Sequence, residues 1–267
     1  MRPPMPEMPA QKTAVVAAAP AGEIAVVAIT RHGIVLAGKV VRALPNARLY
    51  APEKFAAEAE QAAPGAQTYA GKTGDALGTL FGQVDGIVGI VSLGALVRLI
   101  APYLKAKDSD PAVIVLDEQG RFVIPMLSGH LGGANALAGR LADALGATPV
   151  LTTASDVRET LAVDLLGREL GWTLEATHAA LVHASAAVVN DEPVALVQED
   201  GSLDWWTRHA NGRTGPLPGN LRLFERIEDV DPGHFSALLW ISRRSLPTTC
   251  ASAWRGRCVI YRPTEAP

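Results

Sequence analysis

The chain has 267 residues, 48% of them apolar and 19% charged, which is long enough for one large domain or two small ones with proper cores. A net charge of −3, from 24 basic and 27 acidic residues, leaves no electrostatic footprint for nucleic acid or an acidic membrane. Cys250 and Cys258 form neither a CxxC pair nor part of a Cys/His cluster, so a disulfide framework is excluded and a structural zinc site is disfavoured. We interpret both as reduced or buried thiols of a cytosolic protein, with a disulfide between them as the alternative.

The segment 1–22 is rich in proline and contains the apolar patch AVVAAAPA, which Pro20 interrupts. The patch is too short to span a bilayer, and the segment lacks the charged start and the cleavage site of a signal peptide. We therefore expect 1–22 to be a mobile extension on a cytoplasmic chain that has no membrane partner.

Apolar strand-like runs alternate with helical segments from residue 23 to residue 171. Strands are expected at 23–30, 47–52, 85–94, 112–117, 121–127 and 148–153. Helices are expected at 33–45, 53–63, 74–83, 95–104, 134–145 and 155–171. The last of these would have Ser155 or Asp156 as its N-cap. This alternation predicts an α/β fold built on an open, largely parallel sheet with flanking helices.

Beyond Trp172 the pattern changes. A helix is expected at 178–190, followed by short strands at 193–198, 220–225, 236–243 and 257–262. These elements predict a second, smaller α/β domain. We place the two domains at 23–146 and 147–267.

The runs 112–117 and 121–127 flank the turn residues Glu118, Gln119 and Gly120. They predict either a hairpin or two successive strands, and the sequence leaves both open. Asp110 and Asp117 are interpreted as turn residues rather than as acids of a catalytic pair.

The stretch PMLSGHLGGANALAGRLADALG (125–146) places a glycine-containing loop between a strand and a helix. Ligands of open α/β sheets bind at the carboxyl ends of the strands, and a helix N-terminus favours anions. Gly129, Gly132 and Gly133 would let backbone amides approach a carboxylate or phosphate. The loop matches neither GxGxxG, nor a P-loop, nor GxSxG, so the sequence predicts an anion-holding loop of another type.

Three side chains of this stretch are candidates for the site. Ser128 is either a nucleophile or a residue that caps the loop, and its spacing from His130 favours capping. His130 is either a general acid/base or ligand hydrogen-bonder, or a structural residue. Asn135 either faces the loop and ligand or is a solvated helix residue.

Further candidates lie after other expected strands. Arg98 follows the turn Ser92–Gly94 and would bind a carboxylate, or would be an exposed helix arginine. Arg31 and His32 follow the first strand and are expected on the ligand edge. A group of polar residues at and just after the end of the strand at 148–153 is expected on the same edge as His130: Thr152, Thr153, Ser155 and Asp156. Capping is the alternative role for Ser155 and Asp156.

The stretch SLGALVRLIAPYLKAKDSDPAVIVLDEQGRFVIPMLSGHLGGANALA (92–138) closely resembles the signature region of the CbiG family of cobalamin biosynthesis. The resemblance continues through PVLTTASDV, AVDLLGRELGW and NDEPVAL. It begins at VVAITRHGIVLA and reaches CVIYRP, so it covers most of 24–263.

The resemblance implies a cobalt-precorrin-5A hydrolase, which opens the δ-lactone of a cobalt-corrinoid substrate and releases acetaldehyde to give cobalt-precorrin-5B. It implies no cofactor, because the cobalt belongs to the substrate. His130 would then supply the base, and the amides of the glycine loop would hold the oxyanion or a substrate carboxylate.

The sequence departs from the family pattern at two places. Family members carry an acidic residue where this chain has Ala136, so no role of that acid is transferred. They also continue after the RP strand into a CobE-like domain, whereas this chain ends at Pro267. We therefore expect that domain either to be a separate CobE-like protein or to be lost.

Two other functions remain open. One is a non-catalytic cobalt-corrinoid binding or carrier protein that acts with a CobE-like partner. The other is independent of the resemblance, namely an α/β protein that binds a small phosphorylated or nucleotide ligand.

Overall fold

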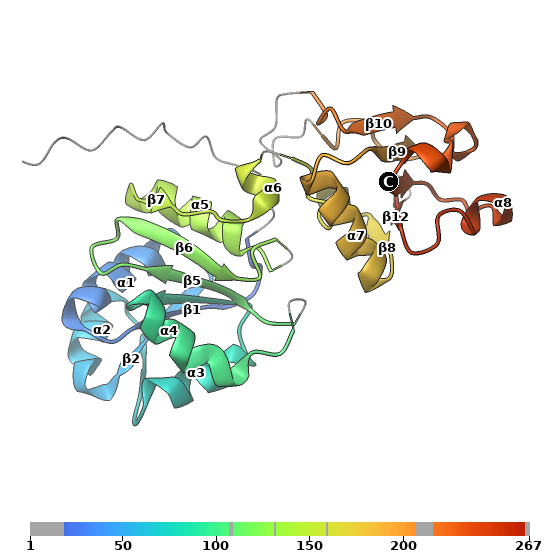
Figure 1. Cartoon of the computed structure of the whole chain (residues 1–267). Coiled ribbons are helices and arrows are strands. Elements are labelled where there is room, and N and C mark those ends of the chain that lie inside the picture. The colour runs from blue at the N-terminus through green and yellow to red at the C-terminus, as the bar shows by residue number, and fades with distance from the viewer. Residues whose placement is uncertain (1–18, 107–108, 131, 159, 207–215, 265–267) are drawn as a thin grey trace, which may run out of the picture. The chain divides into compact units, whose positions relative to one another are not determined.

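A computed structural model describes residues 19–106, 109–130, 132–158, 160–206 and 216–264 (Figure 1). The expected extension lies outside the described residues up to residue 18. Two compact units divide the chain: an N-terminal unit, Ala17–Thr153, and a C-terminal unit, Ala154–Pro267. The division thus follows Thr153 and not residue 146, because the strand that begins at Thr148 pairs within the first sheet.

The N-terminal unit contains a seven-stranded sheet in the order β3-β2-β1-β4-β5-β6-β7. The strands are β1 (Ile24–Ala28), β2 (Ala47–Pro52), β3 (Gln67–Tyr69), β4 (Gly86–Ile90), β5 (Ala112–Leu116), β6 (Phe122–Leu127) and β7 (Thr148–Pro149). Strands β1 to β5 are mutually parallel. β6 runs antiparallel to β5, and β7 is parallel to β6.

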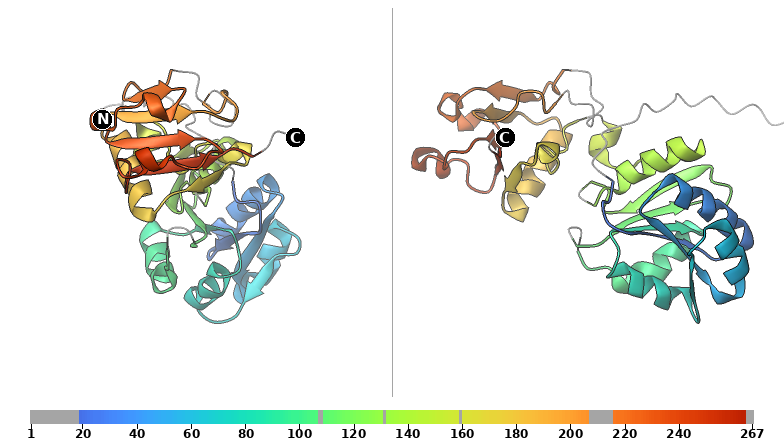
Figure 2. Two further views of the ribbon diagram at one scale, coloured as in Figure 1. Left: turned by 90° about the vertical axis from the view of Figure 1, so that its right-hand side faces the viewer. Right: turned by 180° about the vertical axis from the view of Figure 1, so that it is seen from behind.

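Helices cover both faces of this sheet, as the views in Figure 2 show. Helices α1 (Arg31–Ala43), α2 (Ala56–Ala62) and α5 (Ala134–Leu145) pack on one face, and α3 (Thr73–Phe81) and α4 (Leu93–Ile100) on the other. Single 3₁₀ turns lie at Glu53–Phe55 and Ala101–Tyr103.

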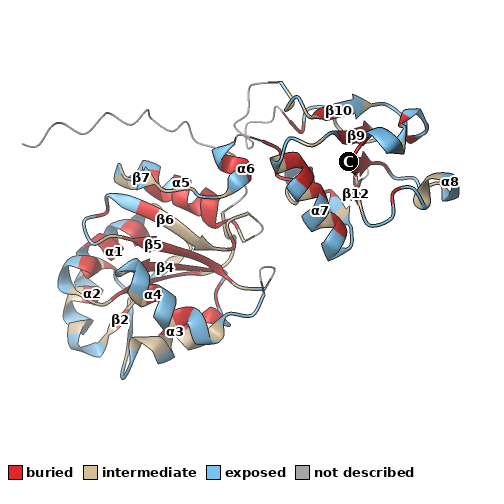
Figure 3. Ribbon diagram, in the orientation of Figure 1, coloured by how far each residue is buried: buried red, intermediate tan, exposed pale blue. Residues whose placement is uncertain are grey.

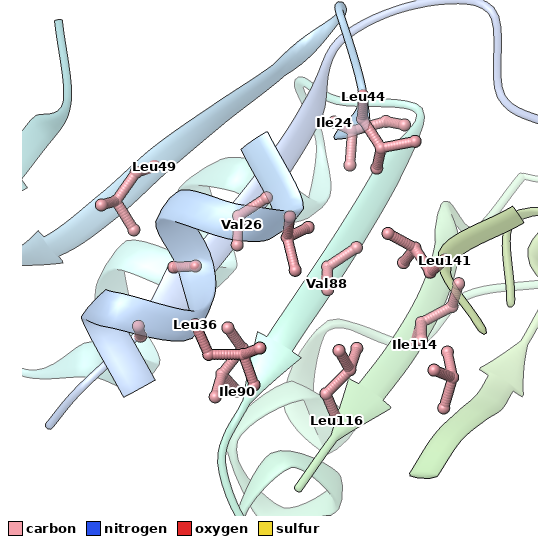
Figure 4. Packing of buried hydrophobic residues seen from close by; sticks show 14 of the residues in the cluster. Ile24, Val26, Leu36, Leu44, Leu49, Val88, Ile90, Ile114, Leu116 and Leu141 are labelled. Carbon is pink, nitrogen blue, oxygen red and sulfur yellow. The ribbon is translucent and has the colours of Figure 1, made fainter. Parts of the chain in front are cut away.

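The central strands β1, β4 and β5 are buried on both sides, which explains their continuous apolar runs (Figure 3). Along β1, Ile24 and Val26 face the cluster under α1, while Ala25 and Val27 face α3 and α4. Figure 4 shows the first cluster, in which Leu36 of α1 and Leu141 of α5 meet the strand side chains. Burial on two faces therefore fixes the three-layer arrangement.

β5 and β6 form a hairpin, so the first of the two alternatives for 112–127 is the observed one. Asp117 closes the turn, since its carboxylate accepts hydrogen bonds from the amides of Gln119 (3.3 Å), Arg121 (2.8 Å) and Phe122 (2.7 Å). Burial raises the pKa of Asp117, but these amide donors outweigh it and leave the pKa below its usual value. The prediction that Asp117 is a turn residue is confirmed.

The C-terminal unit contains a five-stranded sheet in the order β10-β9-β11-β12-β8. Its strands are β8 (Thr173–Glu175), β9 (Val194–Gln198), β10 (Leu221–Phe224), β11 (Ala237–Ile241) and β12 (Cys258–Arg262). β10, β9, β11 and β12 are parallel, and β8 is antiparallel to β12.

Helix α7 (His178–Val189) packs on one face of this second sheet. The other face is covered by the turns Ile227–Asp229 and Pro232–His234 and by residues near α8 (Thr248–Ala251). The predicted fold class, two α/β domains with largely parallel sheets, is confirmed.

The helix predicted at 155–171 is wrong. Only α6 (Ala154–Val157) and a 3₁₀ turn (Arg168–Leu170) form within the described part of this segment. In a helix the Val163 carbonyl would accept the amide of Gly167, but here it accepts the buried hydroxyl of Tyr261 at 2.7 Å. Leu161 and Val163 are buried in the core of the unit from turns, so tertiary packing overrides the helical pattern.

Both cysteines are free, as the first interpretation held, and burial raises the pKa of the Cys258 thiol to about 12. Among the residues that the structure describes, no helix combines the length and the apolar character needed to cross a bilayer.

Replacing Asp117 by Ala should lower the free energy of unfolding by about 2 kcal/mol at pH 7, because three backbone amides lose a charged acceptor. A carboxyl with a lowered folded pKa stabilises the fold above its unfolded pKa, about 3.9. The difference between wild type and variant should therefore shrink as the pH falls below about 4. Urea unfolding at several pH values measures this, with Asp143→Ala, an exposed acid on α5, as the control. An equal, pH-independent loss in both variants would contradict the assignment.

Candidate functional site

The direction of β6 decides where the SGHLGG loop lies. Because β6 is antiparallel to β5, its last residue, Leu127, pairs with Val113 near the start of β5. The loop therefore lies at the amino-terminal edge of the parallel strands. The expectation that it lies at the edge formed by their carboxyl ends is wrong, because a hairpin reverses the strand that leads into it.

Hydrogen bonds within the loop use the first amides of α5. The amide of Ala134 donates to the Ser128 carbonyl (3.2 Å), and that of Asn135 to the Gly129 carbonyl (3.0 Å). The Gly133 amide donates to the His130 carbonyl at 3.0 Å. These three groups, which an anion-holding loop would present to its ligand, are thus engaged by the loop itself.

Ser128 holds the loop to the strand connection before β5. Its buried hydroxyl donates to the Asp110 carbonyl at 2.8 Å. Its backbone has φ of 54°, in the left-handed region that non-glycine residues rarely occupy. The Asp110 carboxylate accepts the amide of Lys105 (3.1 Å), which confirms Asp110 as a turn residue. This environment gives Ser128 a structural function and gives no support to the nucleophile interpretation.

Two glycines of the loop have packing reasons for their identity. A Cβ on Gly132 would lie 2.4 Å from Cβ of Ser128 and 2.9 Å from its carbonyl oxygen, so no side chain fits there. Gly133, the N-cap position of α5, has φ of 80°. The loop can therefore close tightly on itself before the helix begins.

Asn135 and Thr153 are brought together by the parallel pairing of β6 and β7. The Asn135 side chain is buried, and its Nδ2 donates to Oγ1 of Thr153 at 2.9 Å. The interpretation of Asn135 as a solvated helix residue is therefore wrong. Thr153 lies at the same edge as His130, as expected.

His130 is half-buried in this loop. Histidine is the residue type in SGHLGG that most often serves as a general acid/base. The loop therefore presents an imidazole on a backbone that hydrogen bonds hold in place.

Arg98, Arg31 and His32 lie at the opposite edge of the sheet, where β1 and β4 end. The Arg98 guanidinium donates to the Gly94 carbonyl (3.1 Å) in the first turn of α4. Arg31 pairs with Glu58 at 3.1 Å. A strand of five residues, about 16 Å, separates this edge from the loop. Arg98 and His130 are thus not parts of one compact site in this unit.

Ser155 and Asp156 belong to the C-terminal unit, where both are buried. The helix α6 begins at Ala154, so both residues lie inside it and neither is the N-cap. The capping expectation is therefore wrong.

A cavity of about 470 Å³ in the C-terminal unit was not predicted from the sequence. It is lined by charged residues within three positions of the ends of β9, β10 and β11: Glu199, Asp200, Glu225, Arg226, Arg243 and Arg244. The signal was present, because each strand run ends in a charged pair and parallel strands bring their carboxyl ends together.

Two open-sheet α/β units, one of them with a histidine-bearing loop closed on a helix start, define a two-domain α/β protein. Two family models match the chain, one mainly in each unit. Residues 75–156 match the N-terminal region of cobalamin synthesis protein G, and residues 161–263 match the central region of this cobalamin biosynthesis protein. The chain belongs to the CbiG family.

Individual relatives agree with this assignment. A cobalt-precorrin-5A hydrolase from Priestia megaterium is 41% identical over 91% of this chain and 63% of its own length. One from Salmonella typhimurium is 32% identical over 87% of this chain and 62% of its own. The chain therefore spans less than two thirds of these relatives. A crystal structure of a cobalamin biosynthesis protein G homolog from Sulfolobus solfataricus aligns over 90% of this chain and 60% of its own, at 20% identity and a TM-score of 0.46.

Replacing Ser128 by Ala should destabilise the N-terminal unit by about 1–2 kcal/mol, because the Asp110 carbonyl loses its buried donor. Ser128→Gly should recover about 1 kcal/mol of that loss, since glycine adopts a positive φ without strain. Thermal or urea unfolding of the two variants measures both effects. An alanine variant as stable as wild type, or more stable than the glycine variant, would contradict the structural function of Ser128.

Proposed function

We propose that this chain acts in cobalamin biosynthesis as a cobalt-precorrin-5A hydrolase, which opens the δ-lactone and releases acetaldehyde to give cobalt-precorrin-5B. The observation that carries the proposal is the 41% identity with a relative of that name over 91% of this chain, which includes both units. No metal resident in the protein is needed, because the cobalt is part of the substrate.

The first step is hydrolysis of an ester. The oxygen of a water molecule bonds to the lactone carbonyl carbon, the ring carbon–oxygen bond breaks, and the products are a carboxylic acid and an alcohol. The alcohol proton is then removed while a carbon–carbon bond breaks, so that the alcohol carbon leaves as the aldehyde and the electron pair of the broken bond stays on the macrocycle. Both steps require a group that accepts a proton near neutral pH.

His130 is the residue that we propose for this proton transfer. It stands on a loop whose backbone is fixed by the bonds from Ala134 and Asn135 and by the Ser128 hydroxyl. A general base is effective when its position is held by its surroundings, and these bonds supply that rigidity. Ser128 and the loop glycines act as positioning residues in this scheme.

A CobE-like protein is the proposed partner. Because the chain spans 63% of the Priestia megaterium relative, the complete reaction is to be measured with and without such a protein. A gain in activity on its addition would support a split enzyme.

Replacing His130 by Ala should lower kcat for acetaldehyde release by about 10²–10⁴, the usual contribution of a positioned acid/base. His32→Ala is the matched control, because His32 is an exposed histidine at the opposite edge of the same sheet. The assay gives purified protein cobalt-precorrin-5A, with and without the CobE-like protein, and measures acetaldehyde.

The outcomes separate the candidate functions. A rate within twofold of wild type for His130→Ala would remove His130 as the base. No acetaldehyde under either condition would refute the hydrolase. Tight binding of cobalt-precorrin-5A without turnover would favour the carrier function.

A further inference from the structure

The charged cavity of the C-terminal unit lies where an open α/β sheet binds its ligands. β9 and β11 are neighbours in the sheet, yet the chain continues from β9 to β10 on one side and from β11 to β12 on the other. The connections therefore diverge above the carboxyl ends of β9 and β11 and leave a crevice at this topological switch point. Residues that follow these two strands line the cavity.

Glu199, the first residue after β9, is the buried acid of this cavity. Its side chain is only 7% exposed. One oxygen, Oε1, accepts the Ile227 amide (3.1 Å) and Nη1 of Arg244 (3.2 Å). The other, Oε2, is buried and has no hydrogen-bond partner among the described residues. Buried polar atoms in folded proteins are paired as a rule, so Oε2 indicates a donor supplied by a ligand.

Arg244 is held by two carboxylates, one of which is Glu199. Its Nη1 contacts Glu199, and its Nη2 donates to Oε1 of Glu228 at 2.7 Å. The hydrogen bond from Arg244 lowers the pKa of Glu228 to about 2, so this pair stays charged at neutral pH. Arg244 thus places a positive charge against both Glu199 and Glu228 in the lining of the cavity.

Two further arginines retain guanidinium donors. Arg243 donates from Nη2 to the Thr264 carbonyl (3.1 Å), and its Nη1 lies 3.8 Å from Asp200, beyond hydrogen-bond distance. Arg226 pairs with Glu228 through Nε at 3.5 Å, and neither of its Nη groups has an acceptor within the described residues. Both side chains are about half exposed or more, at 47% and 66%, so a ligand can reach them.

The group that donates a hydrogen bond to Oε2 of Glu199 should be neutral. Arg244 already contacts Glu199, so an ammonium group would place a second cation beside that guanidinium. A metal ion is disfavoured as well, because within the described ranges no group of three or more His, Cys, Asp or Glu side chains is placed to hold one. A hydroxyl meets the requirement.

We propose that this cavity binds a hydroxycarboxylate, with its carboxylate on Arg226 and Arg243 and its hydroxyl donating to Oε2 of Glu199. Guanidinium groups suit a carboxylate because their planar N–H pairs match its two oxygens. Such a ligand has two sources. It is either a free hydroxy acid or the carboxylate-bearing substrate with the hydroxyl that lactone opening creates; the second source rests on the proposed function.

The experiment compares three dicarboxylates of the same length by calorimetry with the purified chain. Malate carries the hydroxyl, succinate lacks it, and aspartate replaces it by an ammonium group. Malate should bind about tenfold more tightly than succinate, the usual effect of one buried hydrogen bond to a charged acceptor. Equal binding of malate and succinate, tighter binding of aspartate, or no binding of malate would each overturn the proposal.

Variants of Glu199 and Arg243 test whether these residues cause the preference for malate over succinate. Glu199→Gln should reduce the affinity for malate to that for succinate. Arg243→Ala should weaken the binding of both malate and succinate at least tenfold, and Arg243→Lys should give affinities between those of wild type and Arg243→Ala. Arg255→Ala, an exposed arginine outside the cavity, is the control and should bind as wild type does. Circular dichroism and thermal unfolding verify that each variant is folded. Folded variants that keep the wild-type preference for malate would overturn the assignment.

The acetaldehyde assay distinguishes the two sources. If the substrate occupies the cavity, Arg243→Ala should raise KM for cobalt-precorrin-5A with kcat little changed, and malate should inhibit competitively. If a free hydroxy acid occupies it, KM stays as in wild type while malate binding is lost. Malate calorimetry needs no turnover, so it decides this proposal even if the hydrolase activity is refuted.

Discussion

The antiparallel pairing of β6 with β5 is the constraint on which the N-terminal unit depends. Three amides donate to Asp117 at the turn, and the register from Leu116–Val123 to Val113–Leu127 carries the chain back to the start of β5. This reversal places the SGHLGG loop beside the connection that ends at Asp110, where the Ser128 hydroxyl anchors it. Without the hairpin, the loop would lie at the other edge of the sheet, with Arg98 and His32.

The same constraint changes the chemistry available to the loop. A glycine-rich loop before a helix is typical of anion sites, because its amides are unpaired. Here the amides of Ala134 and Asn135 bond to loop carbonyls, and the close approach of Gly132 to Ser128 closes the loop on itself. The loop therefore holds the backbone of His130 in place, and these amides are not available to bind an anion. Recognition of a carboxylate then requires donors elsewhere in the chain, such as guanidinium groups.

Much of the fold could be predicted from apolar periodicity, since strands buried on both faces, such as β1 and β5, read as continuous apolar runs. Strand direction could not, because the run 121–127 has the same pattern whichever way it pairs. The helix at 155–171 failed for a similar reason: the bond from Tyr261 to Val163 joins residues 98 positions apart, beyond any local pattern. In the site, the pairing of Asn135 with Thr153 likewise depends on the order of β6 and β7.

Both sheets have a switch point at the carboxyl ends of parallel strands, between β1 and β4 and between β9 and β11, but their polar groups differ. At the first, Thr30 caps α1 and donates a hydrogen bond to Glu118, and Arg31 forms an ion pair with Glu58. These polar groups therefore satisfy one another's hydrogen bonds and charges. At the second, Oε2 of Glu199 is buried without a donor in the described part of the chain. The two units therefore differ in what they offer to a ligand. The N-terminal unit has an imidazole on a hydrogen-bonded loop, and the C-terminal unit has arginines beside a carboxylate oxygen that lacks a donor among the described residues.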